Sequence, residues 1–371
     1  MATTDLKKFI VWNPDYIYEL DLAKRLNIDL FDDAELIDGV PTYNIKTDPR
    51  IKIVIKNWWC WHGTDATTNP KVDLSWADLV ICYTGELING PWDWYYKKTV
   101  EQFNNTNFIT VSNGRYDLID FPEDLVYDSI GHFFSKIADK CQFKECNISD
   151  SKPKIFEALF GKGKPHRRFV YNQLEQHNLL DKSFVHLHPG PDDFYYSSPD
   201  LADFDDPAIA LHNRLENQTH IKDLENGISV SISIPLKIYQ NSWYSIVGET
   251  NYCPVYSNFL TEKTAKPLFG KRLFVLFGAQ GLLTRLHSLG YKTFHGIIDE
   301  SYDQISDPQE RWAAAFEQVL KLSTADHAKI YKQIEPILEH NHQHICDHHF
   351  RLNGLKTFLN RHLSKLNKET T

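Results

Sequence analysis

Short apolar runs recur along this chain, each followed by a polar or amphipathic stretch, and this alternation limits the fold more than any single motif does. In the first part of the chain, such runs extend over Lys8–Trp12, Ile51–Ile55, Leu79–Tyr83 and Phe108–Val111. Strands that alternate with helices predict a parallel sheet with helices on both faces. Residues 1–150 are therefore expected to form one open α/β domain.

The same pattern restarts after a polar, proline-bearing stretch at Asn147–Pro153, which has the composition of a linker. A strand is predicted at Lys154–Phe160 and a helix at Arg167–His177. Further strands are predicted at Ser183–His188, Tyr244–Gly248 and Leu273–Phe277. We therefore expect a second α/β domain over residues 151–330 and, because helical patterns dominate the end of the chain, a helical segment over residues 331–371.

Size and charge narrow the possible functions. A chain of 371 residues with 42% hydrophobic residues is long enough for two cores, and two domains imply a cleft between them. The net charge is −9, from 40 basic and 49 acidic residues. This gives no general attraction to nucleic acid or to an anionic membrane, so a sequence-independent DNA-binding protein is disfavoured.

The cysteines and the start of the chain indicate in which cellular compartment the protein is expected. The six cysteines have no C-x-x-C spacing, and the chain is far longer than the small scaffolds that need disulfides. No run approaches the roughly 18 apolar residues that a membrane span needs, and the start lacks a signal-peptide core. We expect a soluble, cytoplasmic protein with reduced thiols.

A basic loop follows the first predicted strand of the second domain. The sequence GKGKPHRR, residues 161–168, holds Lys164 and Arg167 between a strand and a helix. In an open α/β sheet this position lies at the carboxyl end of a strand, where ligands bind. Glycines, a helix N-terminus and arginine suit an anion such as phosphate. The alternative is a solvated basic loop.

Two carboxylates and a lysine form a second constellation. Glu249 ends an apolar run, and Glu262 and Lys263 open a predicted helix 13 and 14 positions later. A carboxylate there suits ribose hydroxyls and the lysine suits a diphosphate. The alternative is that Glu262 complements the helix dipole while Lys263 is solvated.

The segments that hold these residues resemble a known family. GET followed by FLTEKTAKPLFGKRLFVLFG is similar to the donor-site region of α-1,3-fucosyltransferases. It is more similar to glycosyltransferase-like proteins of phages and bacteria, in which KPHR, TEKT-x-KP, LHSLGYKTF and DESYD occur in this order. Here these motifs begin at Lys164, Thr261, Leu286 and Asp299, so the resemblance covers about residues 154–320.

The resemblance implies a GT-B architecture, in which two Rossmann-like domains face a cleft and the carboxyl-terminal one binds a nucleotide-sugar. Carried over by position, Glu262 holds the ribose, Lys263 the diphosphate, and Arg167 the phosphates from the opposite loop. Glu249 matches only the first residue of the family's Glu-Asn-Ser, because Thr250 and Asn251 follow it. The resemblance therefore implies no particular sugar. Fixed cations near the leaving diphosphate stabilise such a transition state without a metal or another cofactor.

Two segments offer alternative metal ligands. Asp203 and Asp205 match an Asp-x-Asp pattern but follow no clear apolar strand, and acid-rich loops match it by chance. His340, His344 and His348 share one helical face, as metal ligands can. Because no carboxylate partner or closing loop is evident, a solvated helix face is the favoured explanation of the histidines, and we predict a metal-independent protein.

The base that activates an acceptor is expected in the amino-terminal domain. His62 and Asp65 lie in NWWCWHGTDATTN beside three tryptophans, and Glu86 and Trp92 lie in GELINGPWDWYY after the next strand. Tryptophan faces stack on sugars, and His, Asp or Glu can accept a hydroxyl proton. The alternative is a tryptophan-rich edge of the core in which Asp65 caps a helix.

The sequence thus predicts a glycosyltransferase that moves a sugar from a nucleotide-sugar donor to a glycan, a protein or a small molecule. One alternative is a phage-type enzyme that glycosylates DNA bases, for which nucleic acid is the acceptor. The other is a non-catalytic carbohydrate-binding scaffold, in which the tryptophans bind sugar and no transfer occurs.

Overall fold

The computed structural model describes residues 35–37, 40–45, 48–57, 71–84, 92–112, 122, 124–128, 134, 137–138, 151–188, 196–197, 234–252 and 259–369. The chain divides into two compact units, Met1–His132 with His348–Thr371 and Phe133–Asp347. The end of the chain therefore belongs to the first unit, whereas the sequence had indicated a separate helical segment over residues 331–371.

The first unit contains a sheet of six strands in the order β1-β2-β3-β4-β5-β6. The strands are β1 (Glu35–Ile37), β2 (Val40–Ile45), β3 (Asp48–Asn57), β4 (Leu79–Thr84), β5 (Phe108–Ser112) and β6 (Val126–Asp128). Strands β3 to β6 run parallel, as their apolar sequences predict, whereas β1 and β2 pair antiparallel at one edge. The strand predicted at Lys8–Trp12 lies outside the described residues.

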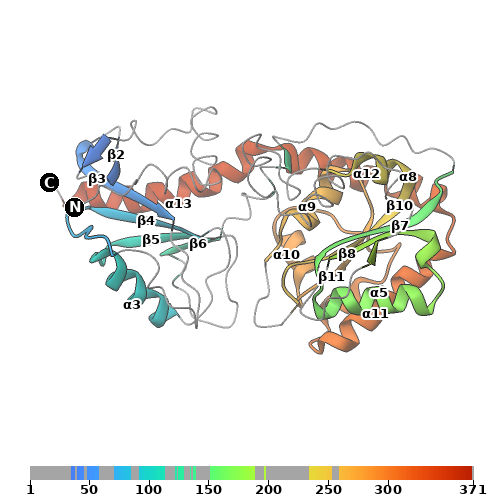
Figure 1. Ribbon diagram of the computed structural model, residues 1–371. Helices are drawn as coiled ribbons and strands as arrows, with labels where there is room; N and C mark the ends of the chain where they lie inside the picture. The colour runs from blue at the N-terminus through green and yellow to red at the C-terminus, as the bar shows by residue number, and fades with distance from the viewer. Residues whose placement is uncertain are drawn as a thin grey trace. The chain divides into compact units, whose positions relative to one another are not determined.

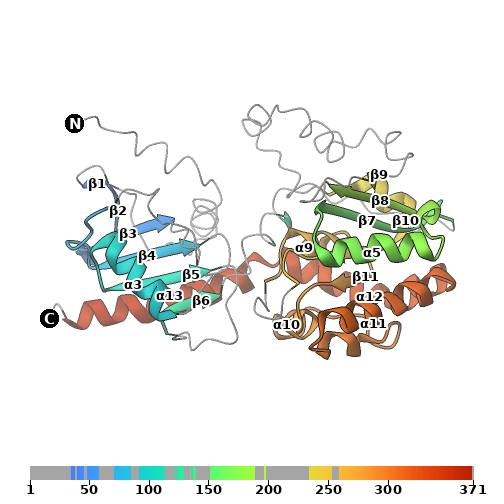
Figure 2. The same ribbon diagram turned by 60° about the horizontal axis from the view of Figure 1, so that its bottom comes forward.

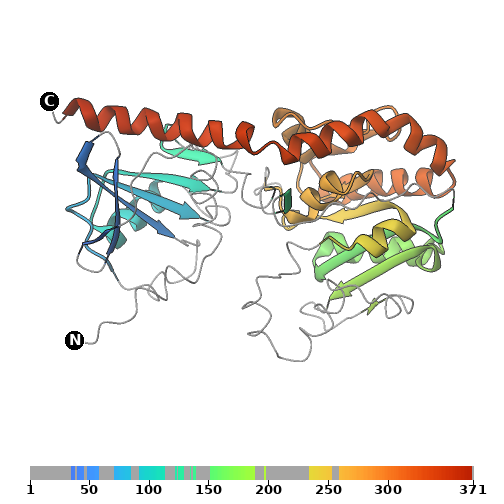
Figure 3. The same cartoon turned by 90° about the horizontal axis from the view of Figure 1, so that it is seen from above.

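Two helices pack on opposite faces of this sheet. Helix α3 (Trp92–Phe103) reaches one face through Tyr95, whose hydroxyl is 3.2 Å from the hydroxyl of Thr110 on β5. Helix α13 (His348–Glu369) covers the other face (Figure 3). Its apolar residues recur at a helical spacing, and Phe358, Leu359 and Leu363 are buried against the isoleucine-rich side of β3 and β4. The core of the first unit is therefore formed by strands from the first part of the sequence together with a helix from its last part.

We expect α13 to be essential for the stability of the first unit. Phe358→Ala removes a buried ring and should lower the free energy of unfolding by about 3–5 kcal/mol, because it leaves a cavity. Asn360→Ala, an exposed neighbour on the same helix, should change it by less than about 0.5 kcal/mol. Urea unfolding followed by circular dichroism measures both, and equal effects would contradict the packing role of α13.

The second unit contains a five-stranded sheet in the order β11-β10-β7-β8-β9 (Figures 1 and 2). Four strands are parallel: β7 (Lys154–Lys162), β8 (Ser183–His188), β10 (Ser242–Gly248) and β11 (Phe274–Phe277). The short β9 (Tyr196–Ser197) is antiparallel to β8. Every residue of β10 and β11 is buried, as expected for parallel strands covered on both faces.

Helices cover both faces of this sheet (Figure 1). Helices α5 (Pro165–Gln176) and α11 (Pro308–Ser323) lie on one face. On the other lie α8 (Leu236–Asn241), α9 (Glu262–Phe269) and α12 (His327–Cys346). The short α10 (Leu282–Ser288) and two 3-10 turns, η2 (Leu180–Lys182) and η6 (Glu300–Gln304), complete the described elements of this unit.

The strand order reverses between β7 and β10. From β7 the chain passes through α5 to β8 on one side, and it later returns to β10 on the other side of β7. In an open α/β sheet the loops that leave such neighbouring strands diverge to opposite faces, and ligands bind between them. The carboxyl ends of β7 and β10 therefore mark the position of a site.

Among the helices that the structure describes, none is both long enough and apolar enough to cross a bilayer.

Candidate functional site

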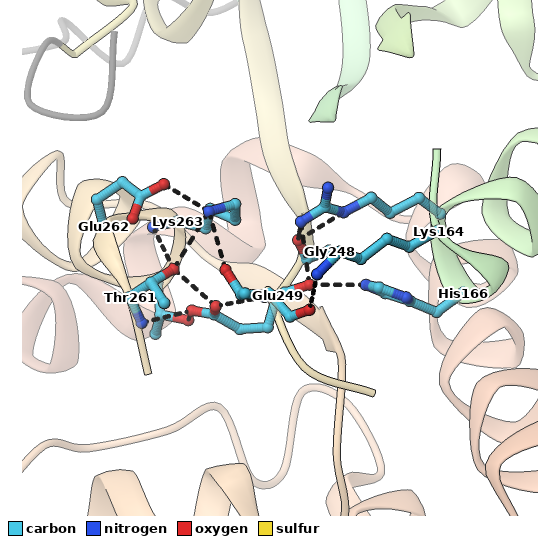
Figure 4. A network of polar contacts seen from close by, with 10 residues as sticks. Lys164, His166, Gly248, Glu249, Thr261, Glu262 and Lys263 are labelled. Atoms are coloured by element: carbon cyan, nitrogen blue, oxygen red, sulfur yellow. Dashed lines mark hydrogen bonds and ion pairs between the residues drawn. The ribbon is translucent and has the colours of Figure 1, made fainter. Parts of the chain in front are cut away.

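Three segments meet at the carboxyl edge of the second sheet, where the strand order reverses. They are the start of α5 after β7, Glu249 and Thr250 after the end of β10, and the start of α9. Figure 4 shows the labelled members of these segments together. The three segments bring together the basic loop and the segment Thr261-Glu262-Lys263, here called the TEK motif, which the sequence singled out. We define the switch-point site as Lys164, His166, Arg167, Gly248, Glu249, Thr250, Thr261, Glu262 and Lys263.

Glu249 lies at the centre of this site and is fully buried. Its Oε1 accepts hydrogen bonds from the backbone N–H of Thr261 at 2.9 Å and from the hydroxyl of Thr264 at 2.6 Å. Its Oε2 accepts from the N–H of Thr250 at 2.8 Å and from the Thr261 hydroxyl at 2.7 Å. The sequence indicated that Glu249 contacts a ligand, but its carboxylate joins β10 to α9 within the protein.

Arg167 is also buried, with 3% of its surface exposed. Its Nε and Nη2 donate to the carbonyl of Gly248 at 3.2 and 3.0 Å, and Nη2 donates to the carbonyl of Glu249 at 3.1 Å. Gly248 makes this approach possible, because a Cβ there would lie 2.9 Å from Cγ of Arg167. The guanidinium expected to meet phosphates in an open cleft therefore contacts the end of β10.

Lys164 and Lys263 approach Thr250 from the two helix starts. Lys164 Nζ donates to the carbonyl of Thr250 at 2.6 Å, and Lys263 Nζ donates to its hydroxyl at 3.2 Å. Lys263 also forms an ion pair with Glu262, and the two side chains remain 24% and 13% exposed. Burial would raise the pKa of Glu262, but Lys263 and Lys266 hold it below its ordinary value.

His166 completes the site, although the sequence analysis gave it no role beyond its place in the KPHR motif. Its Nε2 lies 2.7 Å from the carbonyl of Glu249, and its ring stacks on Tyr252 at 5.2 Å. Because a carbonyl only accepts, Nε2 carries the hydrogen and Nδ1 is a bare acceptor, which has no partner among the described atoms. Burial, and then Arg167, lower the pKa of His166 well below its ordinary value, so the ring is neutral.

The three helices that follow β7, β10 and β11 start differently. Thr261 caps α9, and Asp303 accepts from the N–H groups of Leu283 and Thr284 at the start of α10. At α5 the N-cap residue, Lys164, makes no side-chain capping bond, and Pro165 follows it. The first turn of α5 therefore holds no acidic residue of its own, unlike that of α9, which begins with Glu262.

The remaining sequence candidates fall elsewhere. His62, Asp65 and Glu86, together with Asp203 and Asp205, lie outside the described residues. Within the histidine-rich run, Nε2 of His340 and of His344 contact the carbonyls of Gly290 and Leu289 at 2.9 and 2.6 Å. These histidines hold α12 to the turn after α10. The described residues contain no group of three or more potential metal ligands.

The chain was also compared with known proteins. No protein-family model and no curated protein sequence matches it. A solved structure of an α1,3-fucosyltransferase matches with a TM-score of 0.36 and 12% sequence identity, over 77% of this chain and 80% of the other. The function proposed below rests on the geometry of the switch-point site and on the sequence motifs.

The depressed pKa of His166 predicts a pH dependence of stability. In the unfolded chain a histidine takes up its proton near pH ~6.5, whereas His166 in the folded protein does so only at lower pH. Between these two pH values the unfolded state binds more protons than the folded state does. The free energy of unfolding therefore falls as the pH falls through this range, by up to about 1.4 kcal/mol per pH unit. His166→Gln should make this slope shallower in urea unfolding between about pH 7 and 5. An unchanged slope would show that His166 titrates normally.

Proposed function

We propose that this protein is a nucleotide-sugar-dependent glycosyltransferase whose donor diphosphate binds at the switch-point site. The observation that carries the proposal is the convergence of Lys164 and Lys263, from the starts of two different helices, on Thr250 at 2.6 and 3.2 Å. Two ammonium groups beside a helix whose own first turn holds no acidic residue suit a doubly charged diphosphate better than they suit a neutral ligand.

The chemistry of glycosyl transfer fits this arrangement. Negative charge builds up on the leaving diphosphate as the sugar becomes oxocarbenium-like, and preorganised cations stabilise that charge. Lys164 and Lys263 both donate to Thr250, so their ammonium groups are preorganised by the protein itself. On binding, phosphate oxygens replace the oxygens of Thr250 as acceptors.

We further propose that the reaction is metal-independent. A divalent ion at this edge would need carboxylate oxygens. Glu249 accepts four hydrogen bonds from the protein and Glu262 pairs with Lys263, so neither offers its oxygens without dismantling the start of α9. The cationic part of catalysis is therefore assigned to the lysines.

The other assignments remain predictions. Glu262 is expected to bind the ribose, and one of His62, Asp65 or Glu86 is expected to activate the acceptor hydroxyl. Arg167 is now expected to act by holding the end of β10, since its guanidinium contacts two carbonyls there.

The donor site is tested by thermal shift with UDP, GDP, CDP, ADP and their sugar conjugates, with and without EDTA. A ligand that binds only the folded state stabilises it, by about 2.7 kcal/mol at a concentration 100 times Kd. One nucleotide should raise the melting temperature regardless of EDTA, and Lys164→Ala and Lys263→Ala should each weaken its binding about tenfold, the loss of one charge-assisted contact. Lys182→Ala, an exposed lysine just before β8 at the opposite edge of the sheet, is the matched control.

Two outcomes would change the assignment. If no nucleotide shifts the wild-type protein, or if Lys182→Ala weakens binding as much as Lys263→Ala does, the donor site is not at this edge. If sugars bind but no activated sugar is transferred or hydrolysed, the carbohydrate-binding scaffold becomes the better explanation.

A further inference from the structure

We infer that Glu249 is a positioning residue, which aims the ammonium group of Lys263 through the hydroxyl of Thr261. The inference concerns hydrogen bonds that exist without any ligand. It rests on the proposed function only where it states that the aimed ammonium group meets a diphosphate.

The first step is the polarity of the contacts to Glu249. Its carboxylate accepts and does not donate, so all four of its partners must be donors. Two of them, the N–H groups of Thr250 and Thr261, are backbone donors that cannot reverse their role. The other two are the hydroxyls of Thr261 and Thr264, which must therefore point their protons at the carboxylate.

The second step follows from the single proton of a hydroxyl. Because the Thr261 proton points at Glu249, the lone pairs of Oγ1 face the other way, toward the start of α9. Lys263 donates to this oxygen twice, from its backbone N–H and from Nζ, each at 3.4 Å. Glu249 thus sets the direction in which Thr261 can accept, and Lys263 is held in that direction (Figure 4).

The same carboxylate also bears on a second hydroxyl contact of Lys263, which in addition pairs with Glu262. The N–H of Thr250 is bonded to Oε2 of Glu249, and the hydroxyl of Thr250 accepts from Lys263 Nζ at 3.2 Å. Both threonine hydroxyls that hold this ammonium group therefore belong to residues bonded directly to Glu249.

The arrangement requires a carboxylate, and an amide of the same shape does not replace it. Each oxygen of Glu249 faces one backbone N–H, from Thr261 on Oε1 and from Thr250 on Oε2. In Glu249→Gln the NH₂ group must occupy one of these positions, where it meets a donor whichever way the amide is turned. A buried donor left without an acceptor costs roughly 1–3 kcal/mol.

Thr261 and Thr264 provide a matched pair of variants. Both hydroxyls are buried and both donate to Glu249, but only that of Thr261 also accepts from Lys263. Valine has the same shape as threonine without the hydroxyl. If Glu249 acts through Thr261, Thr261→Val affects Lys263, whereas Thr264→Val removes a bond to Glu249 and leaves the path to Lys263 intact.

The first measurement needs no ligand. The rate at which an acylating reagent modifies Lys263 is measured by mass spectrometry, with Lys182 in the same protein as the reference. We expect the rate to rise at least threefold in Glu249→Gln and Thr261→Val, and to stay within about 1.5-fold of wild type in Thr264→Val and Thr261→Ser. Glu300→Gln is the carboxylate control, since among the described residues Glu300 accepts from one backbone N–H, that of Phe294, and an amide can be turned to suit it. Equal rates in all variants would overturn the inference.

The second measurement uses the nucleotide identified by thermal shift. Glu249→Gln should weaken its binding at least tenfold, and adding Lys263→Ala to that variant should weaken it by less than a further twofold, because the lysine is already misplaced. If the two substitutions instead weaken nucleotide binding by factors that multiply in the double variant, Glu249 acts independently of Lys263. That result would also overturn the inference. If no nucleotide binds the wild-type protein, the proposed function fails while the acylation rates still decide the role of Glu249.

Discussion

The second unit depends on a carboxylate that is buried at the end of a fully buried strand. A charge in such a place is costly unless hydrogen bonds replace the water that it has lost. Glu249 obtains four of them, and all come from Thr250 and from the start of α9. The need to satisfy this one side chain thus fixes where α9 begins relative to β10, and with it the place of the TEK motif on the sheet edge.

The end of β10 is also joined to α5, through hydrogen bonds that its backbone carbonyls accept. Those of Gly248 and Glu249 accept from Arg167, and that of Glu249 also accepts from Nε2 of His166. Both donors come from the first turn of α5, so the loop after β7 and the end of β10 are joined at the place where the strand order reverses. Three buried charged or polar side chains therefore form a rigid base, and the two partly exposed lysines lie at its edge. Precision at a site requires this kind of support beneath the groups that meet the ligand.

The sequence predicted the parallel parts of the fold well, because buried parallel strands are nearly continuous apolar runs. The predictions at Ile51–Ile55, Leu79–Tyr83 and Ser183–His188 correspond to β3, β4 and β8. Strands β1 and β2 were missed, since they are short and include polar residues and a proline. The role of α13 was also missed, because an amphipathic pattern shows that a helix has an apolar face but not which sheet will cover it.

For the site, the order of the motifs along the chain was enough to select the segments that meet: the loop at 161–168, the end of the strand at Gly248 and the TEK helix. The local structure of these segments also explains their residue types. A buried parallel strand needs apolar residues, a helix start needs a capping residue such as threonine, and a close approach of two chain segments needs glycine. Only the tertiary structure decided how deeply each of these charges is buried. Glu249 and Arg167 are buried and bonded to the protein, while Lys164 and Lys263 remain at the edge. The physical reason is that burial and hydrogen-bond partners depend on neighbours distant in the chain, which no local pattern of residues specifies.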